Sequence, residues 1–198
     1  MKPRFTVMEI AEAVRGLVFG SENTDVCGVS TDSRTVEAGE LFIPLRGERF
    51  DGHEYIPAAC QRGVRVFLAE RERSAAMELS PAATCIRVTD TLRALGDLAS
   101  FHRNRFFPAV IGITGSNGKT LVKEMLASIL CLDRKTYRSP LSYNTQIGAA
   151  LGLLGMRRDH EIAIIEAGIS LPGEMERLEK MIRPDHGILT VISKAHIG

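Results

Sequence analysis

The spacing of apolar and polar positions predicts a small domain of alternating helices and strands over residues 1–89. Thr6 and Glu9 form a T-x-x-E pattern ahead of regularly spaced apolar positions, which predicts a capped helix, and Gly16 marks its end. The spacing over 55–62 is also helical, and Gly63 is placed to terminate that helix. Short apolar runs predict strands over residues 41–45, 64–69 and 84–88.

The pattern changes in the second half of the chain, for which we predict a separate domain over residues 90–198. A helix is predicted over 91–105, and a second one over 119–132. Continuous apolar runs, separated by helical segments, occupy residues 109–114, 161–167 and 187–192. Such runs are typical of strands buried on both faces of a parallel sheet. The chain is therefore predicted to be an α/β protein with two domains.

The composition excludes several classes of protein. Of 198 residues, 44% are hydrophobic and 25% charged, which is typical of a folded domain and not of a disordered chain. The net charge of +1 gives no electrostatic reason to expect nucleic acid or an anionic membrane as partner. The four cysteines are scattered, which argues against a zinc site and a disulfide framework. Without an apolar leader or a membrane-length apolar stretch, we expect a cytoplasmic protein.

The segment IGITGSNGKT (111–120) carries the strongest chemical signal. A strand runs into a glycine-rich turn, and a helix follows, so backbone amides and the helix N-terminus can surround an anion. Lys119 would reach the β- and γ-phosphates of a nucleotide, and the Thr120 hydroxyl would bind Mg²⁺. The common phosphate-loop pattern has glycine where this chain has Ile113. The alternative interpretation is a glycine-rich turn that binds no ligand.

Three further side chains are candidates because of their places in the second domain. Glu166 ends an apolar run, where a carboxylate can hold a metal ion, although a solvated acid is the simpler alternative. Asn144 is interpreted equally well as a site residue or as the N-cap of a helix. His196 follows the last apolar run, and its position alone is weak evidence for a role in the site.

The motifs together resemble those of the Mur ligase family. The spacing G-x-x-G-x-x-G-K-T is that family's form of the phosphate loop and accounts for Ile113. STDSR (30–34) and LFIPLRGERFDGHEYI (41–56) are similar to the uridine-nucleotide domain of two family members. The resemblance covers the whole chain. It implies a UDP-sugar-binding domain over 1–89 and an incomplete ATP-binding domain with a parallel sheet over 90–198.

The resemblance also implies an activity. RGERFDGH (46–53) and GSNGKTLVKEMLASIL (115–130) are most similar to the branch that joins D-Ala-D-Ala to UDP-N-acetylmuramoyl-tripeptide. This ATP-dependent amide ligation proceeds through an acyl phosphate and belongs to peptidoglycan synthesis. EAGISLPGEMERLEKMIRP (166–184) is similar to the form fused to an alanine racemase. The implied cofactors are ATP and Mg²⁺, and the partners are the two small-molecule substrates, without nucleic acid or membrane insertion. We expect a monomer.

Carried over by position, the resemblance assigns roles to individual residues. It implies that ATP is bound by Gly115, Ser116, Asn117, Gly118, Lys119, Thr120 and Asn144. It implies that Mg²⁺ is bound by Thr120, Glu166 and His196, and that Lys119, Glu166 and His196 are catalytic. The UDP-sugar site is implied to consist of Ser30, Asp32, Ser33, Arg34, Arg46, Gly47, Asp51, Gly52 and His53. Guanidinium groups, hydroxyls and turn amides are suited to a diphosphate and a uracil edge. The alternative for single residues, such as Asp32 or Asp51, is turn capping.

The chain departs from the family pattern in three places. One of two usual asparagines near 144 is absent, and Val191 stands where an asparagine is usual. The family's carbamylated lysine and amino-acid-binding domain are absent too, so we expect a fragment that is inactive alone. Two alternatives stay open among ligases: a sibling that adds the third, diamino-acid residue, and a folate ligase, which should lack the first domain's motifs. The third alternative is a non-catalytic fragment that binds a UDP-sugar and a nucleotide.

Overall fold

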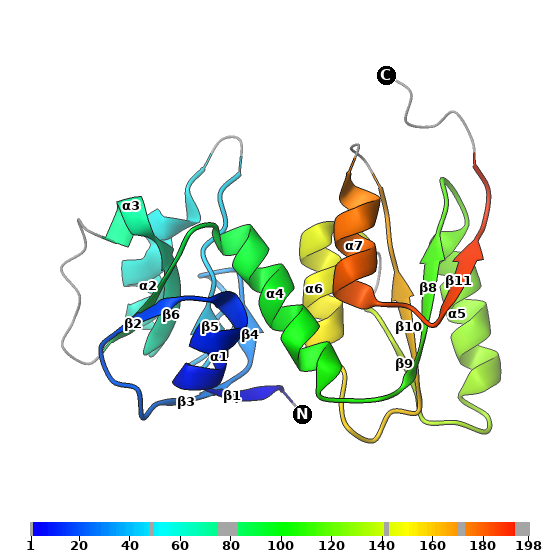
Figure 1. The fold of residues 1–198 in the computed structure, drawn as a ribbon, viewed down its shortest axis with the longest axis horizontal. Coiled ribbons are helices and arrows are strands. Elements are labelled where there is room, and N and C mark those ends of the chain that lie inside the picture. The colour runs from blue at the N-terminus through cyan, green and yellow to red at the C-terminus, as the bar shows by residue number, and fades with distance from the viewer. Residues whose placement is uncertain (1, 48–49, 75–82, 141–142, 170–172, 193–198) are drawn as a thin grey trace. The chain divides into compact units, whose positions relative to one another are not determined.

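Each half of the chain folds around its own principal β-sheet (Figure 1). The structure, a computed structural model, describes residues 2–47, 50–74, 83–140, 143–169 and 173–192. The chain divides into two compact units, Met1–Leu98 and Ala99–Gly198. The division falls within helix α4 (Thr91–Asn104), and the boundary predicted between residues 89 and 90 lies just ahead of this helix.

The first unit contains a five-stranded sheet with the order β2-β7-β6-β5-β4. Only β2 at one edge runs antiparallel to its neighbour, and the other pairs are parallel. The strands are β2 (Leu17–Phe19), β4 (Val29–Ser30), β5 (Leu41–Phe42), β6 (Val66–Glu70) and β7 (Thr84–Val88). A separate antiparallel pair joins β1 (Arg4–Thr6) to β3 (Asp25–Cys27). The three predicted strands β5, β6 and β7 therefore form the parallel centre of this sheet.

The cap predicted at the start of the first helix is confirmed. In α1 (Val7–Val14) the Thr6 hydroxyl accepts from the Glu9 amide at 3.1 Å, and the Glu9 carboxylate accepts from the Thr6 amide at 2.9 Å. The helix ends at Arg15 in a left-handed conformation. The other elements are the 3₁₀ turn η1 (Gly52–Tyr55), α2 (Ile56–Gln61), α3 (Arg71–Ser74) and the first part of α4.

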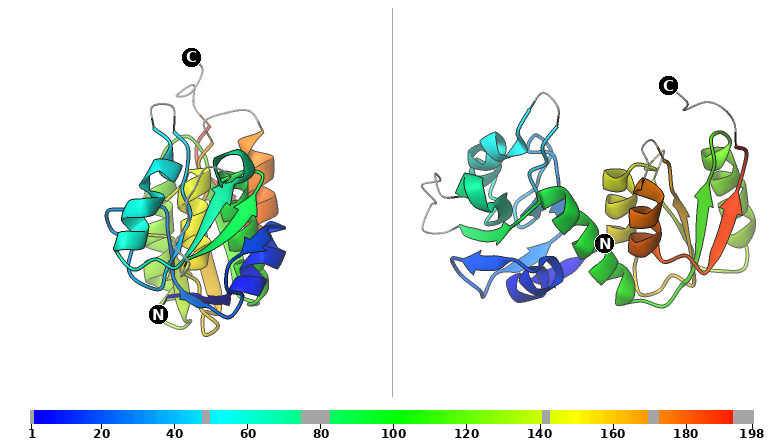
Figure 2. Two further views of the ribbon diagram at one scale, coloured as in Figure 1. Left: turned by 90° about the vertical axis from the view of Figure 1, so that its left-hand side faces the viewer. Right: turned by 45° about the horizontal axis from the view of Figure 1, so that its top comes forward.

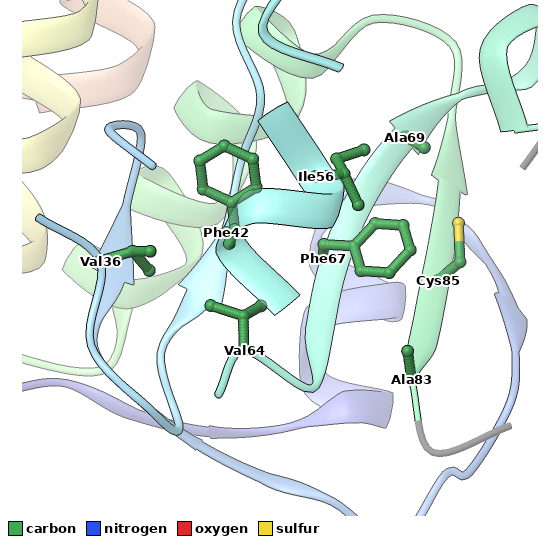
Figure 3. Packing of buried hydrophobic residues seen from close by; sticks show 9 residues of the cluster. Val36, Phe42, Ile56, Val64, Phe67, Ala69, Ala83 and Cys85 are labelled. Carbon is green, nitrogen blue, oxygen red and sulfur yellow. The ribbon is translucent and has the colours of Figure 1, made fainter. Parts of the chain in front are cut away.

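A buried apolar cluster joins α2 to the sheet of the first unit (Figure 3). Phe42 and Phe67, from adjacent parallel strands, have at most 1% of their surface exposed. Ile56 and Ala59 of α2 cover them, and Cys85 lies at the same layer on β7. Because this core anchors β5 and β6, the turns that follow those strands project from a rigid base.

The second unit contains the predicted parallel sheet, with the order β11-β8-β10-β9. Its strands are β8 (Ala109–Thr114), β9 (Thr136–Arg138), β10 (Ile162–Glu166) and β11 (His186–Leu189). All three pairs of strands are parallel. Their carboxyl ends consequently lie at one edge of the sheet, which is where open α/β sheets bind ligands. The strand predicted over 187–192 ends sooner, at Leu189: the Thr190 amide still donates to Thr114 at the end of β8, but Val191 bonds to the loop that follows.

Helices cover both faces of the second sheet. Figures 1 and 2 show α5 (Lys119–Leu130) on one face, and α6 (Gln146–Leu154) and α7 (Glu174–Ile182) on the other. Val122, Leu126 and Leu130 of α5 pack against Ile113 and Ile164 of the two central strands. This packing fixes the start of α5 beside the carboxyl end of β8. Within the described residues, no helix is long and apolar enough to cross a membrane.

Candidate nucleotide and sugar-phosphate sites

The loop that joins β8 to α5 has the backbone geometry of an anion-binding turn. Gly115 and Gly118 have φ angles of 134° and 80°, a region that favours glycine. A Cβ atom at Gly115 would overlap the Thr190 hydroxyl. Gly118 is the N-cap of α5, and no side chain caps this helix start among the described residues. The first-turn amides and the positive end of the helix dipole are thus left for an anion.

Residues after β11 hold this loop from the side. The Ser116 amide donates to the Val191 carbonyl at 2.6 Å, and the Thr190 hydroxyl donates to the Asn117 carbonyl at 2.6 Å. Val191 therefore supports the loop through its backbone, which is independent of the side chain that distinguishes it from the usual asparagine.

The Lys119 ammonium lies over the loop. Its Nζ donates to the carbonyl oxygens of Gly115 at 2.6 Å and Ser116 at 3.2 Å, and the side chain is partly buried. These bonds hold the positive charge beside the turn, where it can exchange carbonyl oxygens for phosphate oxygens.

Glu166 ends β10 directly beside the start of α5, and only 1% of its surface is exposed. Its Oε2 accepts from the Thr120 hydroxyl at 2.8 Å, and its Oε1 accepts from the Asn144 amide at 3.1 Å. The structure thus brings Thr120, Asn144 and Glu166 together. The N-cap of α6 is Thr145, so the interpretation of Asn144 as a helix cap is wrong.

Two residues that the sequence analysis did not single out complete this group. The Lys123 ammonium lies 3.5 Å from Glu166 Oε2 and donates to the Ser139 carbonyl at 3.0 Å. The Glu166 amide donates to the Ser139 hydroxyl at 3.2 Å. Lys123 lies one helical turn after Lys119, but its burial is set by partners on other elements, which local spacing does not show.

The oxygen atoms in this group suit Mg²⁺. A carboxylate and a hydroxyl lie together beside the phosphate loop, and Mg²⁺ commonly binds one or two such protein oxygens together with phosphates and water. Within the described residues, no group of three or more His, Cys, Asp and Glu side chains is suited to hold a metal. His196 lies outside the described residues.

In the first unit, Asp32 organises the turn that follows β4. Its carboxylate accepts from the Arg34 guanidinium in a bidentate pair, with distances of 2.9 Å to Nε and 2.7 Å to Nη2. The Ser30 hydroxyl accepts from the Asp32 amide at 3.2 Å, and Ser33 lies within the same turn. Hydrogen bonds from Arg34 lower the pKa of Asp32 to about 2. The side chain of Arg34 is 85% exposed, which leaves guanidinium surface for a ligand.

The turn after β5 is built around Asp51 and His53. The His53 ring is 3% exposed, and its Nδ1 lies 2.6 Å from Asp51 Oδ1. Its Nε2 accepts from the Glu70 amide at 3.1 Å, so the ring carries its proton on Nδ1. Burial opposes ionisation of Asp51, but hydrogen bonds from His53 and the charge of Arg73 hold its pKa below the ordinary value.

Further contacts stabilise the turn after β5. Arg73 Nη2 lies 3.2 Å from Asp51 Oδ2, and Arg46 Nη1 lies 3.5 Å from Glu70 Oε2. The Gly47 amide donates to the Phe50 carbonyl, and the Gly52 amide donates to the Leu45 carbonyl. Glu70 and Arg73 were not predicted, although Glu70 directly follows the strand predicted over 64–69; it is the last residue of β6 and so lies at the same sheet edge. Since β4, β5 and β6 are adjacent, the two predicted sets of residues share that edge.

Comparison with known proteins agrees with both halves of the chain. Residues 25–103 match the family model described as "Mur ligase family, catalytic domain", and residues 113–198 match "Mur ligase middle domain". The chain belongs to the Mur ligase family. The resemblance and the α/β fold expected from the sequence are therefore confirmed.

Curated relatives within the Mur ligase family cover nearly all of this chain. It is 39% identical over 194 residues to the UDP-N-acetylmuramoyl-tripeptide–D-alanyl-D-alanine ligase of Bacillus subtilis, covering 97% of this chain and 42% of that protein. It is 40% identical over 201 residues to the enzyme of the same name from Treponema pallidum, covering 96% and 43%. The chain thus spans about two fifths of the length of these relatives.

Solved structures of Mur ligases agree with the fold. The match to a crystal structure of MurF from Acinetobacter baumannii has a TM-score of 0.90 at 30% identity, covering 100% of this chain and 43% of that one. The match to MurF from Thermotoga maritima in complex with ADP has a TM-score of 0.76 at 31% identity, covering 85% and 38%.

Proposed function

We propose that this chain supplies the UDP-sugar-binding and nucleotide-binding parts of a UDP-N-acetylmuramoyl-tripeptide–D-alanyl-D-alanine ligase. The observation that carries the proposal is the grouping of Lys119, Thr120 and Glu166 at the mouth of a parallel sheet. The names of the relatives support the choice of substrates. We expect a cytoplasmic monomer.

The proposed reaction has two steps. A carboxylate oxygen of the tripeptide attacks the γ-phosphorus of ATP, which forms an acyl phosphate and releases ADP. The amine of D-Ala-D-Ala then attacks the acyl carbon, and after loss of a proton an amide and inorganic phosphate result. Both reactants of the first step are anionic, so positioning and charge neutralisation are the main tasks of the protein.

The residues of the second unit fit these tasks. Lys119 would exchange its bonds to the loop carbonyls for bonds to phosphate oxygens, while the amides at the start of α5 hold the phosphate chain. Glu166 and Thr120, and by family resemblance His196, would hold Mg²⁺. When bound, Mg²⁺ neutralises charge on the phosphates. Asn144 would keep the Glu166 carboxylate oriented.

The residues of the first unit fit a sugar nucleotide. We propose that the exposed guanidinium of Arg34 contacts the diphosphate. Ser30, Ser33 and the turn at 46–53 would surround the uridine and sugar. Asp32, Asp51 and His53 shape these turns through contacts within the chain.

Titration calorimetry of this chain with ADP and ATP, in the presence of Mg²⁺, tests the nucleotide site. We expect Lys119→Ala to weaken binding by roughly 10–100-fold, because a hydrogen bond to a charged group contributes about 1.5–3 kcal/mol. Lys180→Ala is the control. In the described contacts this exposed lysine pairs with Glu176 on the same helix, so the variant should bind ADP and ATP as the unchanged chain does. Unchanged affinity in Lys119→Ala, or no binding by the unchanged chain, would contradict the proposal.

Activity is tested in a full-length ligase that contains this chain. Phosphate release should depend on ATP, UDP-N-acetylmuramoyl-tripeptide and D-Ala-D-Ala together, and a diamino acid should not replace D-Ala-D-Ala. We expect this chain alone to release no phosphate. Phosphate release with the diamino acid and UDP-N-acetylmuramoyl-dipeptide, in place of D-Ala-D-Ala and the tripeptide, would favour the sibling ligase instead.

A further inference from the structure

Lys123 is a fully buried lysine beside the candidate metal site. It lies on α5, and none of its surface is exposed. Burial of an ammonium is costly unless hydrogen bonds and an opposite charge compensate for the lost water. The position is therefore expected to hold a lysine for a reason other than solubility or general packing.

The contacts of Lys123 converge on Glu166. The Nζ atom lies 3.5 Å from Glu166 Oε2, and it donates to the Ser139 carbonyl at 3.0 Å. Ser139, which follows β9, also accepts the backbone amide of Glu166 through its hydroxyl. Glu124 Oε1 lies 3.6 Å from the same ammonium, but its carboxylate also pairs with Arg138 at 2.8 Å. Lys123 and Ser139 together hold Glu166 from the side of the core.

Lys119 and Lys123 lie one helical turn apart and occupy different environments. Lys119 is partly buried and lies over the phosphate loop, where an incoming phosphate can meet it. Lys123 lies beneath the surface and donates to the Ser139 carbonyl, whereas Thr120 is partly exposed at the start of α5 and links the loop to Glu166 through its hydroxyl. A direct role for Lys123 in phosphate binding does not fit this placement.

We propose that Lys123 is a positioning residue that fixes the Glu166 carboxylate for Mg²⁺. Two hydrogen bonds and one ion pair hold that carboxylate: the Thr120 hydroxyl donates to Oε2, the Asn144 amide donates to Oε1, and the Lys123 ammonium lies 3.5 Å from Oε2. With its orientation fixed from behind, the carboxylate presents its remaining lone pairs at one place beside the phosphate loop. Partners that orient metal ligands in this way commonly change metal affinity by about 10–100-fold when removed. The inference rests on the proposed function of the same site.

The test measures ADP binding to this chain as a function of Mg²⁺ concentration. We expect Mg²⁺ to strengthen ADP binding. In Lys123→Met the Mg²⁺ concentration that gives half of this strengthening should rise by about 10–100-fold. ADP affinity without Mg²⁺ should stay within twofold, because Lys123 does not face the nucleotide. Lys123→Arg keeps the charge and should recover most of the Mg²⁺ response. If Lys123→Met does not fold, Lys123→Gln is measured instead and the same shift is expected.

A second pair of variants shows whether Lys123 acts through Glu166. Glu166→Gln alone should lose most of the Mg²⁺ response, and adding Lys123→Met to it should cause no further change. An unchanged or lower Mg²⁺ requirement in Lys123→Met would overturn the inference and leave a buried ion pair that only stabilises the fold. Failure of the unchanged chain to bind ADP at any Mg²⁺ concentration would instead contradict the proposed function, and the inference with it.

Discussion

The two candidate sites differ in how their charges are held. In the second unit, Glu166 and Lys123 are 1% and 0% exposed, and each is held by partners from several elements. In the first unit, Arg34 and Arg46 have side chains 85% and 55% exposed. Loss of one member of a buried charge pair changes both the binding geometry and the free energy of unfolding. Loss of one member of an exposed pair changes the free energy of unfolding little. Substitutions of the buried pair should therefore affect stability and binding together, whereas substitutions of the exposed arginines should affect mainly binding.

Glu166→Ala should give the largest effect on stability. It leaves the Lys123 ammonium buried without its partner, and loss of one member of a buried pair costs about 3–5 kcal/mol. Urea unfolding measures the change, and ADP binding should lose its Mg²⁺ dependence. Glu161→Ala is the control, since that glutamate is exposed and pairs with Arg134 at the surface. Equal free energies of unfolding in the two variants would show that the buried pair does not stabilise the fold.

His53→Ala tests a deeply buried side chain of the first site. The change removes the partner of Asp51 and the acceptor of the Glu70 amide, so we expect a loss of about 2–4 kcal/mol in the free energy of unfolding. The exposed His186→Ala should change it by less than about 0.5 kcal/mol. A loss below 1 kcal/mol in His53→Ala would mean that the turn does not depend on these bonds.

Gly115→Ala strains the phosphate loop. The φ angle of 134° disfavours a side chain, and the added methyl group would overlap Thr190, so a cost of about 1–3 kcal/mol and weaker ADP binding are expected. Gly187→Ala, where an added methyl group has open space, serves as the comparison. Calorimetry and thermal unfolding report both effects. The strain argument fails if the two variants behave alike.

Arg34→Ala should give the smallest effect on stability at neutral pH, because its ion pair is exposed and screened by solvent. The pKa of Asp32 should rise from about 2 toward 3.8, as measured by NMR titration. Since the folded-state pKa is lowered, the stability contributed by this pair is present above about pH 3.8 and disappears as the pH falls through about 2. Binding of UDP should nevertheless weaken. Arg93→Ala, which removes another exposed ion-paired arginine, should leave UDP binding unchanged.

Local patterns predicted the elements that depend on neighbouring residues. The Thr6–Glu9 cap, the strands β5, β6 and β7 and the order of strand, loop and helix around residues 109–130 all follow from short-range chemistry. The three-residue strands β1, β2 and β3 are too short to show a periodic pattern, and pairing partners distant in sequence define them.

The residues of the sites were predicted to different extents. The glycine-rich loop, Lys119 and Thr120 are recognisable because one continuous segment carries the whole motif. Lys123 was missed because its burial depends on Ser139 and Glu166, which come from two other elements. The contacts of His53 with Glu70, and of Asp51 with Arg73, likewise join segments 17 and 22 residues apart, beyond the reach of local spacing.

The bonds between Lys119 and the loop carbonyls have a consequence for how quickly a nucleotide is accepted. Before a phosphate can use this ammonium, the bonds to Gly115 and Ser116 must break. The rearrangement adds an activation barrier to association, and the lost internal bonds lower the net affinity. In Lys119→Ala that step is absent, so the association rate should fall less than the affinity, and most of the loss should appear as faster dissociation.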